Sequence, residues 1–187
     1  MARSQTTLVK IIVAGASQAG KTSLVNKFVF DQFLDVAPTI GINFAQKISF
    51  GNFGPLNMSI WDLSGQSRFQ FLMPKFCSGA SGLVLVFDQT RPQTLKEAYD
   101  WMKLVQEHAY PGGRMAIVLA GTKSDLSGLV PKNRIDRFCY EHQISSFISC
   151  SAKSGLHVDK VFSCLASAIQ RSSPELSVPA FALINSP

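Results

Sequence analysis

The stretch "LVKIIVAGASQAGKTSLVNKFVF", residues 8–30, decides the fold, because a glycine-containing loop joins two elements of different hydrophobic period. Residues 8–14 are almost entirely apolar, as expected of a short strand covered on both faces. Residues 23–30 instead carry their apolar side chains on one helical face, namely Leu24, Val25, Phe28 and Val29. The loop between them, "GASQAGKT", fits the pattern GxxxxGK[ST] of phosphate-binding loops.

This loop predicts a nucleoside triphosphate site. Its backbone N–H groups can surround phosphate oxygens, and the following helix directs its positive end toward them. Lys21 can reach the β- and γ-phosphates, and the Thr22 hydroxyl can bind Mg²⁺. An ordinary strand-to-helix turn is disfavoured, because the match lies between a predicted strand and a predicted helix. The predicted phosphate-binding residues are Gly15, Ser17, Gln18, Ala19, Gly20, Lys21, Thr22 and Ser23.

The rest of the chain alternates between strand-like and helix-like segments. Strands are predicted around 42–50, 56–62, 82–88, 114–121 and 145–150, and helices around 95–105, 131–142 and 157–171. The turn "GNFGP" makes a hairpin of the first two strands. We therefore expect a three-layer α/β domain with a mostly parallel sheet, one antiparallel edge hairpin and helices on both faces.

Four further stretches end predicted strands or lie beside them, where open α/β sheets bind ligands. In "WDLSGQ", Asp62 can hold Mg²⁺ through water, Gly65 offers an N–H to a γ-phosphate, and Gln66 can orient the attacking water. In "APTIG", Thr39 can offer a second hydroxyl to Mg²⁺ and its N–H to the γ-phosphate. Taken alone, each stretch is also explained by an ordinary turn.

The other two stretches point to the base. In "GTKSD", Asp125 can accept both N–H donors of guanine while Lys123 lies along the ring; as a lone motif, Asp125 is better explained as a cap of the next element. In "CSAK", the N–H of Ala152 can bond the guanine oxygen, and Lys153 can cover the other ring face. The order of all five stretches on one rim makes chance agreement negligible.

The motifs "GASQAGKT", "PTIG", "WDLSGQSRF", "TKSD" and "SAK" resemble those of the Ras superfamily of small GTPases, over residues 8–172. They are most similar to the Rab branch, although "PTIGINF" also resembles Arf proteins. The resemblance implies a P-loop NTPase G domain with a six-stranded sheet, bound GTP or GDP and Mg²⁺. It also implies two switch loops around Thr39 and Gln66, and base contacts from Phe33, Thr122 and Ser151.

The resemblance implies a switch that hydrolyses GTP slowly and cycles between GDP and GTP states to control effector binding, and its Rab-like features imply a role in membrane trafficking. Gln66, Lys21 and Thr39 are the predicted catalytic residues, and Thr22, Thr39 and Asp62 (through water) the metal site. No arginine precedes Thr39, so an activating protein is expected to accelerate hydrolysis; for Ras itself the gain is about 10⁵-fold. An exchange factor and effectors are expected as well.

Two other classes of function fit these motifs less well. A nucleotide-binding scaffold without turnover is disfavoured, because Gln66, Thr39, Lys21 and Thr22 are all present. A P-loop kinase or ATPase is disfavoured by "TKSD" and "SAK". The apolar residues after Gln66 either pack the switch helix onto the sheet or offer an effector surface; these are Phe69, Phe71, Leu72, Met73 and Phe76.

Three of these motifs depart from the pattern of small GTPases. Val36, Ala37 and Pro38 stand where many relatives carry an aromatic lid, which predicts faster nucleotide exchange. Thr122 replaces the usual asparagine of the base-reading motif, as in Rho-type relatives. Ser17 replaces a glycine of Ras, as is normal in Rab-like proteins.

Composition and charge limit the domain number, the kinds of partner and the localisation that we expect. The 187 residues fit one domain, and the net charge of +6 is spread without a basic run, so no nucleic acid is expected. The four cysteines lie far apart, which predicts reduced, buried thiols. No signal peptide or membrane span is apparent, and no cysteine for prenylation follows Cys164. We expect a cytoplasmic protein that reaches membranes, if at all, only through partners. In the extension at 173–187, the apolar segment 178–184 can dock on the domain, on a partner or weakly on lipid, and docking on the domain is favoured.

Overall fold

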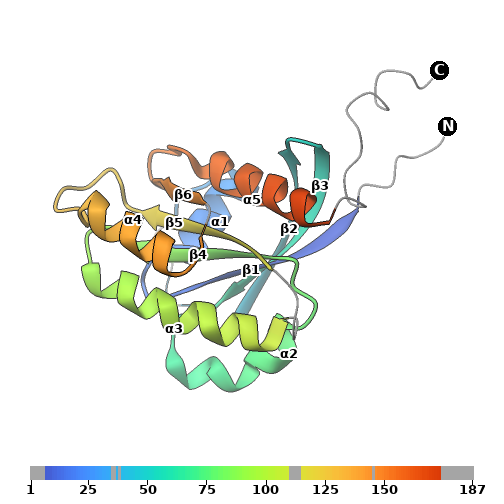
Figure 1. Cartoon of the computed structure of the whole chain (residues 1–187), viewed down its shortest axis with the longest axis horizontal. Helices are drawn as coiled ribbons and strands as arrows, with labels where there is room; N and C mark the ends of the chain where they lie inside the picture. Colours follow the sequence, from blue (N-terminus) through green and yellow to red (C-terminus); the bar gives the residue numbers. More distant parts are fainter. Residues whose placement is uncertain (1–6, 35–36, 38, 110–114, 145, 174–187) are drawn as a thin grey trace.

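A computed structural model describes residues 7–34, 37, 39–109, 115–144 and 146–173 (Figure 1). Its six strands form one sheet: β1 (Leu8–Gly15), β2 (Ile42–Gly51), β3 (Gly54–Leu63), β4 (Gly82–Asp88), β5 (Ala116–Thr122) and β6 (Ser146–Ser149). The helices are α1 (Lys21–Phe30), the 3₁₀ helix η1 (Ser67–Leu72), α2 (Met73–Cys77), α3 (Pro92–Ala109), α4 (Lys132–Glu141) and α5 (Val158–Ser172). Outside the described residues lie Val36 and Pro38, which stand where relatives carry an aromatic lid, and the segment 174–187.

The sheet confirms the predicted architecture. Its strand order is β2-β3-β1-β4-β5-β6, and every neighbouring pair is parallel except the hairpin β2–β3 at one edge. All seven residues of β4 are buried, which accounts for the unbroken apolar run 82–88 in the sequence. The predicted strand 114–121 begins two residues later, at Ala116.

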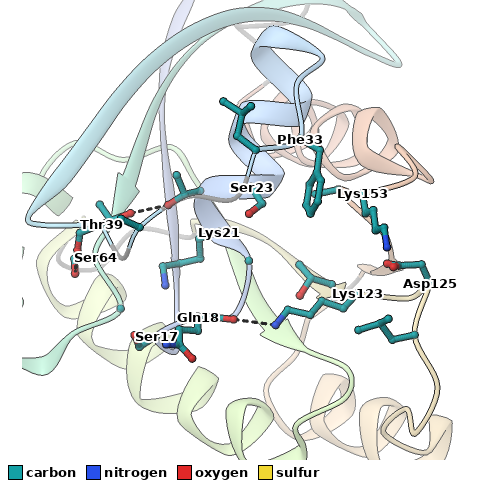
Figure 2. A pocket seen from close by; sticks show the side chains of 18 of the residues that line it. Ser17, Gln18, Lys21, Ser23, Phe33, Thr39, Ser64, Lys123, Asp125 and Lys153 are labelled. Carbon is teal, nitrogen blue, oxygen red and sulfur yellow. Dashed lines mark hydrogen bonds between the residues drawn. The ribbon is translucent and has the colours of Figure 1, made fainter.

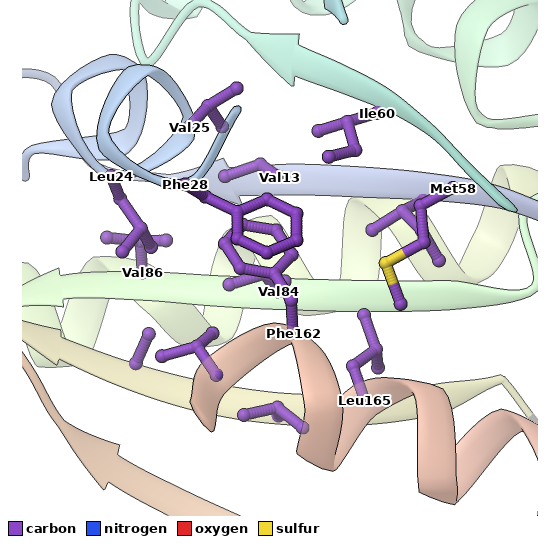
Figure 3. Close-up of a cluster of buried hydrophobic side chains, with 14 of the residues drawn as sticks. Val13, Leu24, Val25, Phe28, Met58, Ile60, Val84, Val86, Phe162 and Leu165 are labelled. Atoms are coloured by element: carbon purple, nitrogen blue, oxygen red, sulfur yellow. The ribbon is translucent and has the colours of Figure 1, made fainter. Parts of the chain in front are cut away.

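Two hydrophobic cores lie on the two faces of the sheet. Helices α1 and α5 cover one face, and α2, α3 and α4 cover the other (Figure 1). In the first core, Phe28 of α1 stacks on Phe162 of α5, with ring centroids 3.8 Å apart (Figure 3). Buried residues at i, i+3 and i+4 in these helices explain why the helical period was readable in the sequence.

Polar contacts fasten the tip of the β2–β3 hairpin to α5, and we call these contacts the hairpin latch. The Ser167 hydroxyl accepts from the N–H of Asn52 at 2.9 Å, and Gln170 Oε1 accepts from the N–H of Phe53 at 3.2 Å. Gln170 Nε2 donates to the carbonyl of Gly54 at 3.1 Å. A Cβ at Gly51 would lie 2.8 Å from the Ser167 backbone nitrogen, so only glycine permits this close approach.

The segment after Gln66 differs from the simple helix that its sequence suggested. It forms η1 and then the short α2, so its aromatic and apolar side chains do not share one face. Met73 is buried, Phe76 is half-buried, and Phe71 is 74% exposed. The side chain of Leu72 lies outside the described set. Buried Met73 therefore fits the packing interpretation, and exposed Phe71 leaves the effector surface a prediction.

Smaller corrections concern α3 and the cysteines. The helical spacing of Leu95, Ala98, Tyr99, Met102 and Val105 predicts one apolar stripe on α3. Tyr99 is instead 38% exposed and stacks on His142 with ring centroids 4.5 Å apart. All four cysteines are free, but only Cys77 and Cys150 are buried. No helix within the described residues is long and apolar enough to cross a membrane.

Candidate nucleotide-binding site

The predicted phosphate loop begins at Gly15, the last residue of β1, and ends at Thr22 in the first turn of α1. Gly15 and Gly20 have φ angles of +147° and +86°, and a Cβ at Gly15 would lie 2.0 Å from the Val86 carbonyl oxygen. Glycine is therefore required at Gly15 for the loop to leave the sheet beside β4. Gly20 is also the N-cap of α1, so the helix N-terminus opens directly into the loop.

Lys21 folds back into this loop. Its Nζ donates to the carbonyls of Gly15 and Ala16 at 2.9 and 2.8 Å, and the residue is 5% exposed. Burial lowers the pKa of Lys21 to about 8, although the nearby Asp62 carboxylate acts in the opposite direction. Its two hydrogen-bond partners are neutral carbonyl groups, which do not cancel its charge. Such a buried ammonium group is well suited to bind an anion.

Two hydroxyls and a carboxylate meet beside Lys21. The Thr22 hydroxyl donates to Asp62 Oδ2 at 2.6 Å and lies 2.7 Å from the Thr39 hydroxyl. Burial raises the pKa of Asp62 to about 6, against the effects of the Thr22 hydrogen bond and the Lys21 charge. Asp62 Oδ1 is buried and makes no hydrogen bond of acceptable geometry with the described residues.

This group of oxygens fits the predicted Mg²⁺ site. Hydroxyl and carboxylate oxygens are the ligands Mg²⁺ uses, usually together with water and substrate phosphates. The unpaired Oδ1 atom offers an acceptor for a metal-bound water, which agrees with the indirect role expected of Asp62. Thr22, Thr39 and Asp62 come from three separate segments, so the fold itself assembles the group.

The segment from Ser64 to Gln66 touches both the phosphate loop and the Thr39 segment. A Cβ at Gly65 would lie 2.5 Å from Lys21 Nζ and 2.5 Å from the Ser17 backbone nitrogen. The Ser64 hydroxyl donates to the Thr39 carbonyl at 2.8 Å, and Gln66 Nε2 donates weakly to the same oxygen at 3.5 Å. The two predicted switch loops are thus linked to each other.

The predicted base end lies across the rim. Ser151 is fully buried, and its hydroxyl donates to Asp125 Oδ1 at 2.6 Å, which fixes the carboxylate. Thr122 is also buried, and its hydroxyl donates to the carbonyls of Ala19 and Phe87 at 2.6 and 3.0 Å. Thr122 therefore ties β5 to the phosphate loop, and its hydroxyl is already engaged by backbone.

A pocket of about 520 Å³ runs between these two ends (Figure 2). Side chains of Phe33, Lys123, Asp125 and Lys153 surround one end in Figure 2, and Thr39 and Ser64 lie at the other. The predicted residues that line it are Ser17, Gln18, Gly20, Lys21, Thr22, Ser23, Phe33, Thr39, Gly65, Gln66, Thr122, Lys123, Asp125, Ala152 and Lys153. Gly15, Ala19, Asp62 and Ser151 lie behind the lining.

Sequence reasoning missed several contributors. Ser64, Leu34 and Leu126 also line the pocket, and Asp88 with Arg91 contacts the phosphate loop from behind. Asp88 could have been found, because it is an acidic residue ending a buried strand on the same rim as Asp125. Arg91 carries no such signal, since its contact with Ser17 spans 74 residues of sequence.

Comparison with known proteins agrees with this geometry. The family model described as "Ras family" matches residues 10–171. "GTP-binding protein ypt4" of Schizosaccharomyces pombe is 36% identical over 169 residues, covering 87% of this chain and 71% of that protein. "Ras-related protein Rab-13" of Bos taurus is 34% identical, covering 89% and 82%, and "Ras-related protein RABA2a" of Arabidopsis thaliana is 33% identical, covering 88% and 76%. The chain therefore belongs to the Ras family of small GTPases, within its Rab branch.

Proposed function

We propose that this protein is a GTP-binding molecular switch that hydrolyses GTP slowly and acts in membrane trafficking. The observation that carries the proposal is that one pocket receives residues from all five predicted loops. Phosphate-binding and base-binding groups lie at its opposite ends, as a nucleotide requires. Residues 8–172 make up the GTPase domain in this proposal, and 173–187 are an extension.

The phosphate loop and Lys21 hold the polyphosphate, and Asp125 selects guanine. Asp125 accepts the two N–H donors of guanine, an edge that adenine does not present. The hydroxyl of Ser151 donates to Asp125 Oδ1 at 2.6 Å and holds the carboxylate in place for this contact. Phe33 and the stems of Lys123 and Lys153 flank the ring.

For hydrolysis, Gln66 orients a water molecule in line with the γ-phosphorus. The water oxygen bonds to phosphorus as the bond between phosphorus and the β-phosphate oxygen breaks. GDP leaves with the electron pair, and the water proton passes to an oxygen of the released phosphate. Lys21 and the N–H groups of the phosphate loop stabilise the charge that develops. Mg²⁺, when bound by Thr22, Thr39 and Asp62 through water, neutralises phosphate charge. Turnover is slow because no arginine of the Thr39 loop reaches the γ-phosphate, so an activating protein supplies that charge.

The switch works through Thr39 and Gly65, whose N–H groups meet the γ-phosphate and are released after hydrolysis. Next to these loops an aromatic row crosses the sheet edge, formed by Phe44 of β2, Trp61 of β3 and Phe76 of α2. Its ring centroids lie 5.6 and 5.7 Å apart, and Phe44 is 61% exposed. Exposed Ile40 and Phe71 extend this surface, which supports effector binding beside the switch loops.

The test is to identify the nucleotide that copurifies with the protein and to follow phosphate release from GTP. We expect bound GDP or GTP and slow release, which Gln66→Leu lowers at least about tenfold because the water is no longer oriented. Bound ATP would overturn the assignment of the base. Bound GTP without any turnover in the wild type would favour a scaffold.

A further inference from the structure

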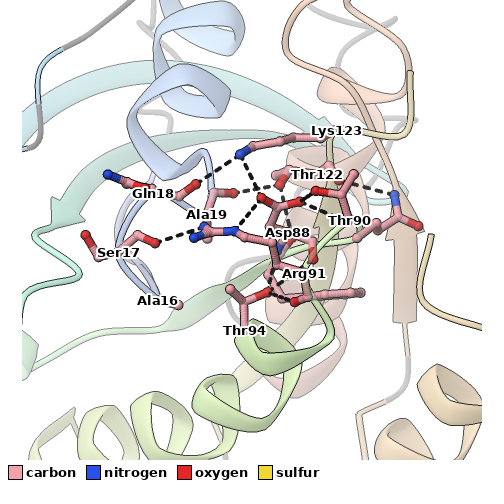
Figure 4. Close-up of polar contacts among 12 residues, drawn as sticks. Ala16, Ser17, Gln18, Ala19, Asp88, Thr90, Arg91, Thr94, Thr122 and Lys123 are labelled. Atoms are coloured by element: carbon pink, nitrogen blue, oxygen red, sulfur yellow. Dashed lines mark hydrogen bonds and ion pairs between the residues drawn. The ribbon is translucent and has the colours of Figure 1, made fainter. Parts of the chain in front are cut away.

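The strongest unassigned polar cluster surrounds Asp88 at the end of β4 (Figure 4). The Asp88 side chain is 1% exposed, yet Oδ2 lies 2.9 Å from Arg91 Nε and 2.7 Å from Lys123 Nζ. Its Oδ1 accepts from the N–H and the hydroxyl of Thr90 at 2.9 and 2.7 Å. Burial alone would raise the pKa of Asp88, but these hydrogen bonds hold it below its ordinary value.

The two cationic side chains that bind Asp88, Arg91 and Lys123, also bind the phosphate loop. Arg91 Nη2 donates to the Ser17 carbonyl at 3.1 Å, and Lys123 Nζ donates to the Gln18 carbonyl at 3.2 Å. Together with the bond from Thr122 to Ala19, three consecutive carbonyls of the loop are bound from outside it. Figure 4 shows Arg91, Lys123 and Thr122 reaching the loop from β4, β5 and the segments that follow them.

The planarity of the peptide unit gives these contacts a consequence for anions. In a trans peptide the carbonyl of one residue and the N–H of the next point in opposite directions. Holding the carbonyls of residues 17–19 toward Arg91, Lys123 and Thr122 therefore aims the N–H groups of Gln18, Ala19 and Gly20 away from them. That direction is the inner side of the loop, where Ala19 already donates across it to the Ala16 carbonyl at 3.3 Å.

We propose that Arg91, oriented by Asp88, is a positioning residue that presets the N–H groups of the phosphate loop for the β-phosphate of the nucleotide. The inference rests on the proposed nucleotide site and assigns Arg91 no contact with the nucleotide. Its planar guanidinium is suited to the task, because Nε and Nη2 bind Asp88 and Ser17 at the same time.

A competing explanation is simple attraction between the positive charge of Arg91 and the phosphates. The two differ in what lysine can do at this position. Lysine keeps the charge but has a single donor group, so it cannot span Asp88 and Ser17 in the same fixed geometry. The side chain of Arg91 is 41% exposed, so its replacement need not disturb a buried core.

The experiment measures dissociation constants for GDP and GMP with nucleotide-free full-length protein, for the wild type, Arg91→Gln and Arg91→Lys. We expect Arg91→Gln to weaken GDP binding about tenfold and GMP binding less than about twofold, because GMP lacks the β-phosphate. Arg91→Lys is expected to remain clearly weaker than the wild type toward GDP. The ³¹P resonance of the β-phosphate of bound GDP should shift in both variants. Arg134→Gln, at an exposed position on α4, is the matched control and should leave both constants unchanged.

Each remaining outcome decides against the inference in a different way. Equal losses for GDP and GMP in Arg91→Gln would mean a general structural defect. Full recovery in Arg91→Lys would mean that charge alone acts, and wild-type affinity in Arg91→Gln would mean that the loop is set without Arg91. Failure of the wild type to bind GDP would instead overturn the proposed nucleotide site.

Discussion

The buried ammonium group of Lys21 shows how a single residue combines structural and chemical roles. In the nucleotide-free chain it is bound by the Gly15 and Ala16 carbonyls, which hold it at the mouth of the loop. Burial lowers its pKa to about 8, so a substantial fraction is neutral in mildly alkaline solution. Phosphate groups favour the charged form, and binding must therefore restore a proton.

This gives a pH prediction for nucleotide binding. The protonated form of Lys21 is the binding form, so GDP affinity should fall as the pH rises above about 8, approaching tenfold per pH unit. Calorimetry at about pH 8.5 in two buffers of different ionisation enthalpy should show uptake of a proton. Lys21→Met should remove the uptake, and identical apparent enthalpies for the wild type in both buffers would contradict the assignment.

A second prediction concerns the missing lid. Ala37 lines the pocket and is exposed, and its methyl group offers a bound nucleotide no aromatic contact at this position. Ala37→Tyr should slow the release of labelled GDP by about threefold to tenfold, because an aromatic contact adds roughly 0.5–1.5 kcal/mol. Ala37→Ser is the control with a small polar side chain. Equal release rates in the tyrosine and serine variants would reject the idea.

At this scale the sequence was informative where a residue type and its spacing express one chemistry. Lys21, Thr22 and Asp125 could be singled out because each belongs to a short motif at a strand end. Arg91 could not, because its role depends on a side-chain direction that connects the segment between β4 and α3 with a loop far away in the chain. The hydroxyl of Ser64 was missed for the same reason, since its partner is a backbone carbonyl of the other switch loop.

Among the elements, the β2–β3 hairpin is anchored at both ends. At one end Thr39 and Asp62 flank it and meet at Thr22, and at the other the hairpin latch fixes its tip to α5. Gln170 is 1% exposed and serves as both donor and acceptor to the hairpin backbone. No motif marks Gln170 in the sequence, where it lies on a helix whose stripe is otherwise apolar.

Loss of the latch should therefore destabilise the fold. Gln170→Leu removes the side-chain partner of two part-buried backbone groups, the Phe53 N–H and the Gly54 carbonyl, which costs about 1–3 kcal/mol of the free energy of unfolding. Urea denaturation would measure the loss. Gln106→Leu, at an exposed position of α3, is the matched control and should change stability little. Equal stability of both variants would show that the latch contributes nothing measurable.

Regular elements were predictable because their hydrophobic pattern is long and unbroken. In α5 this pattern is a helical period, and in β4 it is a continuous apolar run. The segment 67–77 was not, because a 3₁₀ helix followed by a five-residue α-helix has no single period. Its apolar residues therefore separate into buried Met73 and exposed Phe71, a division that composition alone cannot reveal.

At the scale of the whole molecule, the pocket is built from loops that are far apart in sequence, so ligand binding is linked to global stability. The Thr22–Asp62 and Thr122–Ala19 bonds join segments 40 and 103 residues apart. Unfolding separates all of them, and the unfolded chain cannot form the site. Any ligand that binds only the folded chain must therefore stabilise it.

We expect GDP with Mg²⁺ to raise the free energy of unfolding of the nucleotide-free protein by about 2.7 kcal/mol at a free concentration of 100 times Kd. Addition of a chelator should reverse part of this gain, because Thr22 and Asp62 lose their shared cation. Thermal or urea unfolding would measure both effects. ATP at the same concentration serves as the control, and stabilisation by ATP equal to that by GDP would argue against base selection by Asp125.

The hairpin latch has a consequence for how other molecules could recognise this protein. Because the latch fixes the tip to α5, the hairpin can respond to the γ-phosphate only at its other end, near Thr39 and Asp62. The patch around Asn52, Phe53 and the last turn of α5 should then look the same before and after hydrolysis. A partner protein that binds this patch should therefore have the same affinity for the GDP-bound and the GTP-bound protein.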